Sequence, residues 1–332
     1  MPDSSSSVVG SPIRPIIQVE DLTKNYGPYR AIDSLTFSIN KGEVVGFLGP
    51  NGAGKTTTMK IITGSMAASA GTARIAGFDV FEDPIEVKRR IGYLPETPPV
   101  YGDMSVESYL KFVAQLKGVR SENVKRFVER AIEKTDLGSV RRRLIQNLSK
   151  GFRQRVGISQ ALVSDPEVLI LDEPTVGLDP RQVAEVRALI KELAGQHTII
   201  LSTHILPEVQ ASCQRIIIVN KGKIVAQDSI DRLSSRMSSS GRVHLGVLKP
   251  SAQLQTAFAQ ASGVTGARLS DSDAARNLAD RLFYEIDTDG SKETAARLAE
   301  IAAPHGLFEM RQETFNLEDV FLKLTTSEEK QT

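Results

Sequence analysis

The segment that most constrains the fold is the octapeptide GPNGAGKT at residues 49–56. It matches the pattern G-x-x-x-x-G-K-[ST], and it lies between the strand-like run VVGFL and a helix-like run that begins TTTMKII. Glycines at this spacing let successive backbone N–H groups converge on phosphate oxygens at the N-terminus of a helix. The match therefore predicts a strand, a phosphate-binding loop and a helix inside one α/β unit.

Each residue of this loop is a candidate nucleotide contact: Gly49, Pro50, Asn51, Gly52, Ala53, Gly54, Lys55, Thr56 and Thr57. We expect the Lys55 ammonium to reach the β- and γ-phosphates and the Thr56 hydroxyl to bind Mg²⁺. A glycine turn without a ligand is the alternative interpretation, but the flanking strand and helix argue against it. A dinucleotide-binding fingerprint is excluded, because Thr57 stands where its third glycine would have to be.

A second motif is the run EVLILDE at residues 167–173, which predicts a buried strand that ends in two carboxylates. Beside a phosphate-binding loop, Asp172 is expected to bind the metal and Glu173 to activate water as a base. The alternative is a pair of solvated carboxylates at the end of a strand.

Strand-like runs alternate with helical patterns up to about residue 235, which predicts an α/β domain with a mainly parallel sheet. Within it, residues from about 98 to 162 read as a helical subdomain. One of its helices opens at Ser105, and the spacing of Tyr109, Leu110, Val113 and Leu116 predicts one buried face. The expected order along the chain is a tail (1–14), the α/β domain (15–235), a Ser-rich linker (236–241), an α+β domain (242–326) and a tail (327–332).

The predicted C-terminal domain alternates strands and helices. Its strands are RVHLGVL, LFYEIDTD and LFEMRQE, and its helices lie near residues 253–261, in KETAARLAEIAA and in LEDVFLKL, which Asn316 is expected to cap.

Composition excludes several classes of protein. Lys plus Arg is 41 and Asp plus Glu is 40, so the net charge of +1 gives no reason to expect a nucleic-acid partner. The single cysteine, Cys213, excludes a disulfide framework, and we expect it to be a small buried residue and not a nucleophile. No signal peptide and no apolar run of about 20 residues is present, so the chain is expected to be cytoplasmic.

With these motifs the chain resembles the ATP-binding cassette (ABC) proteins, and among them the cassettes of the ABC-2 type exporter group. The signature loop of that family is matched by LSKGF at 148–152, a further loop by GLD at 177–179, and the switch histidine by His204. The resemblance runs from about Ile16 to Thr325 and is nearest to gliding-motility cassettes. It implies a P-loop NTPase fold that adds an antiparallel β subdomain and an inserted helical subdomain to the core sheet.

The resemblance also implies a function. The chain would be the ATPase subunit of a transporter, with ATP and Mg²⁺ as cofactors. It would dimerise head to tail, with itself or with a second cassette. It would drive a separate integral membrane permease from the inner face of the cell membrane, and drug, lipid or polysaccharide cargo remains open.

Further site residues follow from the resemblance. His204 would join Lys55 and Glu173 in catalysis at the γ-phosphate, and Tyr26 would stack on adenine. Ser149 and Gly151 would bind the ATP of the opposite subunit. Without that context, Ser149 reads as an ordinary helix cap, Tyr26 as a packing residue and His204 as a satisfied core or surface histidine.

Two positions depart from the family pattern. Glu96, in GYLPE, replaces the usual glutamine, and we expect its carboxylate to bind Mg²⁺ through water. Phe152 replaces a glutamine at the end of the signature loop and cannot donate that residue's hydrogen bonds.

Two other functions fit the motifs less well. A soluble ABC ATPase that acts on ribosomes or DNA usually carries two cassettes, a coiled-coil insertion or a basic arm, and the chain has none of these. A regulatory module without hydrolysis is disfavoured because Glu173 is intact.

Overall fold

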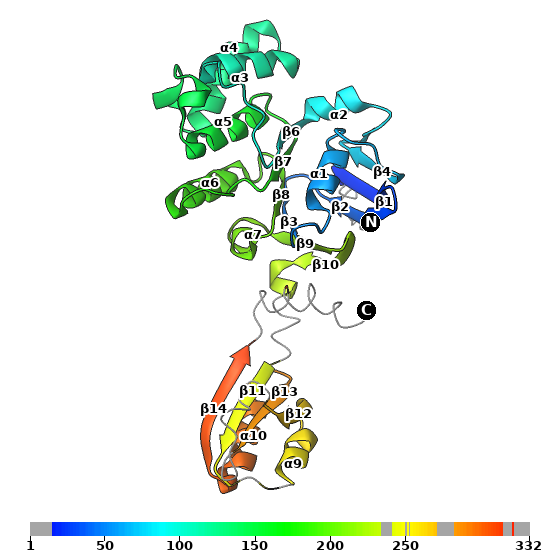
Figure 1. Ribbon diagram of the computed structural model, residues 1–332, viewed down its shortest axis with the longest axis vertical. Helices are drawn as coiled ribbons and strands as arrows, with labels where there is room; N and C mark the ends of the chain where they lie inside the picture. Colours follow the sequence, from blue (N-terminus) through cyan, green and yellow to red (C-terminus); the bar gives the residue numbers. More distant parts are fainter. Residues whose placement is uncertain are drawn as a thin grey trace, which may run out of the picture. The chain divides into compact units, whose positions relative to one another are not determined.

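The computed structural model describes residues 15–233, 241–249, 251, 253–270, 282–314 and 321. The chain divides into two compact units, Met1–Gln227 and Asp228–Thr332, each of which is described here by itself (Figure 1). The predicted tails, nearly all of the predicted linker and all of the predicted helix behind Asn316 except Phe321 lie outside the described residues.

The described part of the first unit contains two sheets and seven α-helices. The strands are β1 (Ile17–Tyr26), β2 (Tyr29–Ile39), β3 (Val44–Leu48), β4 (Ala70–Ile75), β5 (Phe78–Asp79), β6 (Ile91–Leu94), β7 (Val168–Asp172), β8 (Thr198–Thr203), β9 (Arg215–Asn220) and β10 (Lys223–Ser229). The α-helices are α1 (Lys55–Ile62), α2 (Pro84–Arg90), α3 (Val106–Leu116), α4 (Ser121–Lys134), α5 (Lys150–Leu162), α6 (Pro180–Leu193) and α7 (Leu206–Ser212), with short 3-10 helices η1 (Gly138–Val140) and η2 (Ile145–Asn147). No helix in the described part of the chain is both long and apolar enough to span a membrane.

The core sheet of the first unit has the strand order β10-β9-β3-β8-β7-β6. All the strand pairs from β9 to β6 are parallel. Strands β3, β7 and β8 are buried along their whole length, which explains why VVGFL, VLILD and TIILST read as near-continuous apolar runs. The predicted mainly parallel sheet is confirmed, and its carboxyl edge carries the loops that follow β3, β6, β7 and β8.

The second sheet is antiparallel, with the order β2-β1-β4-β5. Its inner face packs with Met59, Ile61 and Ile62 of α1 and with apolar residues of the core sheet in one continuous cluster. The antiparallel subdomain implied by the family resemblance is thus present, and α1 lies between the two sheets (Figure 1).

Between β6 and β7 the chain forms helices joined by loops, and no named strand. α3, α4 and α5 group together (Figure 1) and share an apolar cluster that includes Tyr109, Leu110 and Val113. Ser105 is the N-cap of α3, where a helix was predicted to open, and its hydroxyl accepts a 3.2 Å hydrogen bond from the Ser108 N–H. The prediction that Leu116 is buried was wrong: it is 70% exposed, because it is the last residue of α3 and the chain then turns away at Gly118.

From residue 241 on, the described part of the second unit contains one four-stranded sheet and the α-helices α9 and α10. Its elements are β11 (Gly241–Val247), α9 (Leu254–Gln260), β12 (Val264–Leu269), β13 (Leu282–Thr288), α10 (Lys292–Ala302), η4 (Ala303–His305) and β14 (Leu307–Thr314). The sheet is antiparallel with the order β12-β13-β11-β14, which is the split β-α-β arrangement of ferredoxin-like folds. Both helices contribute to the apolar cluster of this unit, through Phe258 and Leu298.

Strand β12 was not predicted. It is an edge strand with exposed or half-buried residues throughout, and Gly266 interrupts its pattern. Its sequence therefore lacks the apolar alternation that marks a strand with one buried face.

Candidate active site

The phosphate-binding loop connects β3 to α1, and its shape depends on the close approach of Gly54 to Ala31. A Cβ on Gly54 would lie 2.7 Å from the Ala31 carbonyl oxygen, and Gly54 has a φ of +102°, so only glycine fits there without strain. Gly54 is also the N-cap of α1, with no side chain capping the helix and no acidic residue in its first turn. The N–H groups at this end of α1 therefore remain available to an anion.

Lys55 is the first residue of α1, and its ammonium is held inside the loop. Its Nζ donates to the Gly49 carbonyl oxygen at 2.8 Å and lies 3.5 Å from Glu173 Oε1. Only 6% of Lys55 is exposed. The loop thus places one positive charge where the phosphates of a nucleotide would bind.

Asp172 ends β7 and is fully buried. Its Oδ1 accepts a 2.7 Å hydrogen bond from the Ser202 hydroxyl, whereas its Oδ2 has no partner. Burial raises the pKa of this carboxyl, and the hydroxyls of Ser202 and Thr56 oppose that shift. A buried carboxylate oxygen without a partner, close to a threonine hydroxyl, fits an oxygen-binding cation such as Mg²⁺. Among the described residues no group of three or more His, Cys, Asp or Glu could hold a metal ion, so such a cation would depend on phosphate oxygens as well.

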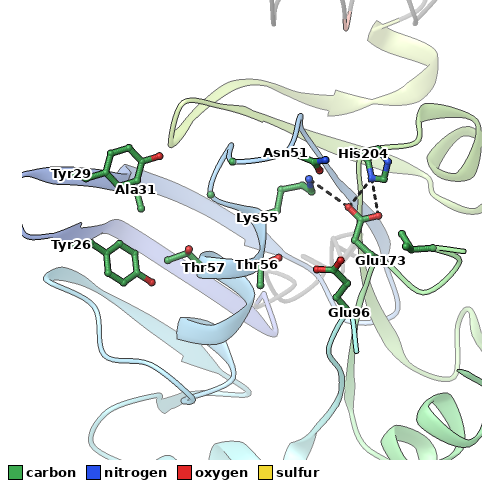
Figure 2. Close-up of a pocket in the computed structure, with 13 residues that line it drawn as sticks. Tyr26, Tyr29, Ala31, Asn51, Lys55, Thr56, Thr57, Glu96, Glu173 and His204 are labelled. Carbon is green, nitrogen blue, oxygen red and sulfur yellow. Dashed lines mark hydrogen bonds and ion pairs between the residues drawn. The ribbon is translucent and has the colours of Figure 1, made fainter. Parts of the chain in front are cut away.

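Glu173 is held between two nitrogen groups. The His204 Nδ1 lies 3.0 Å from both of its carboxylate oxygens, and the Lys55 ammonium approaches Oε1 as well (Figure 2). Its backbone has a φ of +50°, unusual for a residue other than glycine, and its N–H donates to the Ser202 carbonyl oxygen at 2.8 Å. A strained backbone of this kind persists only where its surroundings hold it, and it is typical of functional positions.

Lys55, Glu173 and His204 line a cavity of about 510 Å³, a size that suits a nucleotide. It is lined by Tyr26, Tyr29, Ala31, Asn51, Gly52, Gly54, Lys55, Thr56, Thr57, Glu96, Glu173, Val176 and His204. One end is formed by Tyr26 and Tyr29, which are 45% and 59% exposed and pair across the β1–β2 hairpin (Figure 2).

Most of the predicted site residues line this cavity. Gly49, Pro50 and Ala53 belong to the loop but do not line the cavity, and Asp172 is fully buried and does not line it either. Sequence analysis missed Tyr29, Ala31 and Val176. Tyr29 could have been found from the Gly-Pro pair after Tyr26, because a turn there places Tyr29 opposite Tyr26 on the next strand.

Ser149 and Gly151 lie at the N-terminus of α5 and do not line the cavity. The Ser149 hydroxyl accepts a 3.3 Å hydrogen bond from the Phe152 N–H, as an ordinary helix cap does. Phe152 packs against the apolar cluster of the helical subdomain. The substitution at this position thus serves packing among the helices.

Glu96 follows β6 and is exposed. Its carboxylate points into the cavity, below Glu173 and near Thr56 (Figure 2). Glu96 and Val176 also line a neighbouring cavity of about 440 Å³ that includes Lys150 and Arg153 at the start of α5.

Cys213 lies away from the cavity, partly buried against the apolar cluster around α6. Burial raises the pKa of its thiol to about 12, and the carboxylate of Glu208 adds to the shift. A thiol this difficult to ionise is a poor nucleophile, as expected from the sequence.

The known proteins that this chain resembles in sequence and in structure are ATP-binding proteins of ABC transporters. A family model described as "ABC transporter" matches residues 32–176. The bacitracin transport ATP-binding protein BcrA of Bacillus licheniformis is 37% identical over 223 residues, which are 67% of this chain and 72% of BcrA. The linearmycin resistance ATP-binding protein LnrL of Bacillus subtilis (strain 168) is 29% identical over 93% of this chain and 98% of LnrL. The solved structure of cbiO1 from Clostridium perfringens, part of the ABC transporter complex cbiONQ, has a TM-score of 0.59 at 29% identity over 65% of this chain and 88% of cbiO1.

Proposed function

Because the chain belongs to the ABC transporter family and is an ATP-binding subunit, we propose that it hydrolyses ATP in this cavity to drive export through a separate membrane permease. The observation that carries the proposal is the placement of Glu173. A buried carboxylate stands between the Lys55 ammonium and the His204 imidazole, at a cavity whose wall includes the N-terminus of α1. Glu173 can then act as the base, and Lys55 and His204 can both contact the γ-phosphate.

The proposed mechanism begins with an exchange of partners at Lys55. In the structure its ammonium contacts Glu173 and a loop carbonyl oxygen. Phosphate oxygens carry more charge and would draw the ammonium away, because charge-assisted hydrogen bonds to phosphate are strong. Glu173 is then free to accept the proton of an attacking water, while His204 orients toward the γ-phosphate.

Residues near the α1 N-terminus would hold Mg²⁺. We assign Thr56 and Asp172 as the groups that bind it, with Glu96 reaching it through water. The partnerless Oδ2 of Asp172 supports this assignment. The ion would neutralise charge on the phosphates.

A second copy of the chain, or another cassette, would complete the site. Ser149 caps a 13-residue helix outside the cavity and Gly151 lies in its first turn, where the N-terminal N–H groups could meet the ATP of an opposite subunit. The permease partner is supported by the relatives, which are named as transport or resistance ATP-binding proteins. The chain would then act at the inner face of the cell membrane, bound to the permease.

Co-expression with a candidate permease tests this function. The chain should enter the membrane fraction only when the permease is present, and the complex should hydrolyse ATP with Mg²⁺. Sedimentation with ribosomes, and no association with the permease, would instead support the soluble-ATPase alternative.

Glu96 should affect the ATPase rate through its contact with Mg²⁺. We expect the Glu96→Gln variant to keep its ATPase activity, and we expect that activity to depend less on Mg²⁺ concentration. The amide removes a negative charge that repels the triphosphate, and its oxygen is still a weak metal ligand. Glu96→Ala should cost more activity and should uncouple hydrolysis from the permease. The measurement is ATPase rate against Mg²⁺ concentration.

Glu82 provides the matched control, since it is exposed and does not line the cavity. Glu82→Gln should give the wild-type curve. If the curves of both Glu96 variants also superimpose on the wild-type curve, Glu96 has no role at the metal.

The second unit should be dispensable for nucleotide binding. Every residue that lines the cavity lies between positions 26 and 204, inside the first unit. Deletion of residues 241–332 should therefore leave the Kd for ATP within about twofold, as measured by calorimetry. A soluble, folded truncation that fails to bind ATP would contradict this division.

A further inference from the structure

Glu208 is a buried carboxylate close to the active site that the proposed mechanism does not use. It lies in α7, only 2% exposed, and none of the ion pairs among the described residues involves it. A carboxylate buried without a cation is costly unless hydrogen bonds compensate it. Its hydrogen bonds therefore show what keeps it there.

Two threonine hydroxyls compensate this carboxylate, and they come from different parts of the chain. The Thr175 hydroxyl donates to Glu208 Oε1, and the Thr203 hydroxyl donates to Oε2 at 3.0 Å. Thr175 lies two residues after Glu173, and Thr203 directly precedes His204. Glu208 thus joins the segment that carries the base to the segment that carries the histidine.

The Thr203 hydroxyl also lies 3.2 Å from Glu173 Oε2. A hydroxyl has one proton, so it can donate fully to only one carboxylate at a time. While it donates to Glu208 it does not donate fully to Glu173, so the Glu173 carboxylate keeps more of its capacity to accept a proton.

The helix that carries Glu208 is fixed against the core sheet. Val209 packs so closely on β3 that a Cβ on Gly46 would lie 2.3 Å from its Cγ1. Its neighbour Glu208 is therefore held at a set distance from the ends of β7 and β8.

We propose that Glu208 is a positioning residue for ATP hydrolysis: through Thr175 and Thr203 it holds Glu173 and His204 in their reactive arrangement. The proposal rests on the proposed function. It adds a group that touches no substrate and acts through the two hydroxyls.

The test is the steady-state ATPase kinetics of the full-length chain. Glu208→Ala should lower kcat by about tenfold or more, because a misplaced catalytic group loses much of its effect, and should leave KM for ATP within about twofold. Glu208→Gln should recover most of the loss, since its amide can accept from one hydroxyl and donate to the other. This split between kcat and KM, together with the rescue, is not expected of a carboxylate that only stabilises the fold.

A double variant isolates the hydrogen bond. Thr175→Val should lower kcat, and Glu208→Ala combined with Thr175→Val should be no slower than Glu208→Ala alone, because both changes remove the same link. Thr198→Val is the matched control, since Thr198 is a buried, hydrogen-bonded threonine at the other end of β8. Its kcat should equal that of the wild type.

Each result has a clear meaning. If wild-type protein binds ATP but does not hydrolyse it, both the proposed function and this inference are wrong. If the wild type hydrolyses ATP while Glu208→Ala keeps kcat within twofold, or while the losses of the double variant add, only the inference is wrong. Should Glu208→Ala fail to fold, a folded Thr175→Val variant with wild-type kcat overturns the proposal equally.

Discussion

Replacing Glu173 by Gln should stop hydrolysis while ATP still binds. The amide keeps the shape of the side chain and can still accept a hydrogen bond from Lys55, but it cannot take a proton from water. Removal of a general base costs about 100- to 10,000-fold, so kcat should fall by that factor, with the Kd for ATP nearly unchanged. Single-turnover hydrolysis and equilibrium binding of labelled ATP measure the two quantities.

The same variant tests the proposed dimer. If ATP joins two copies and hydrolysis separates them, Glu173→Gln should accumulate as a stable dimer when ATP is added, and light scattering should report twice the monomer mass. Glu192→Gln, an exposed glutamate on α6, should behave as the wild type. A Glu173→Gln protein that stays monomeric with saturating ATP would falsify the proposed role of ATP in dimerisation.

The second large effect is expected for Lys55→Ala. The variant loses the positive charge that the loop holds toward the phosphates, and hydrogen bonds to charged groups contribute about 1.5–3 kcal/mol each. Affinity for ATP should therefore fall about 10- to 150-fold, and ATPase activity should be abolished even at saturating ATP. Calorimetry and a phosphate-release assay measure these changes.

Lys60 is the control for this experiment because it lies on the same helix, α1, but is exposed in the last turn. Lys60→Ala should change neither affinity nor turnover. Unchanged turnover in purified Lys55→Ala would remove the assignment of the phosphate-binding loop, and with it the mechanism.

Much of the fold could be predicted because its determining signals are local. The runs VVGFL, VLILD and TIILST are nearly continuous in apolar residues, and each proved to be a strand buried along its whole length. The glycines of the phosphate-binding loop specify backbone shapes that other residues cannot adopt, so the strand, loop and helix were also predictable.

The features that were missed depend on contacts between distant segments. Tyr29 joins the cavity only because the hairpin pairs it with Tyr26, and β12 is visible only as the neighbour of β13. The network around Glu208 brings together residues about 30 positions apart through the pairing of β7 with β8. A buried glutamate in the first turn of a short helix gives no local sign of such a role.

The strand order also has a consequence for how the protein is made. The phosphate-binding loop follows β3 and the two carboxylates lie at the end of β7, but the strand between β3 and β7 is β8, which ends at Thr203. β3 and β8 are separated by about 150 residues, and pairings between such distant segments form slowly. A nascent chain that ends before residue 198 already contains the nucleotide-binding loop, but it lacks β8 and β9, the two strands that pair with β3. ATP can therefore act as a ligand for folding only after most of the first unit has left the ribosome.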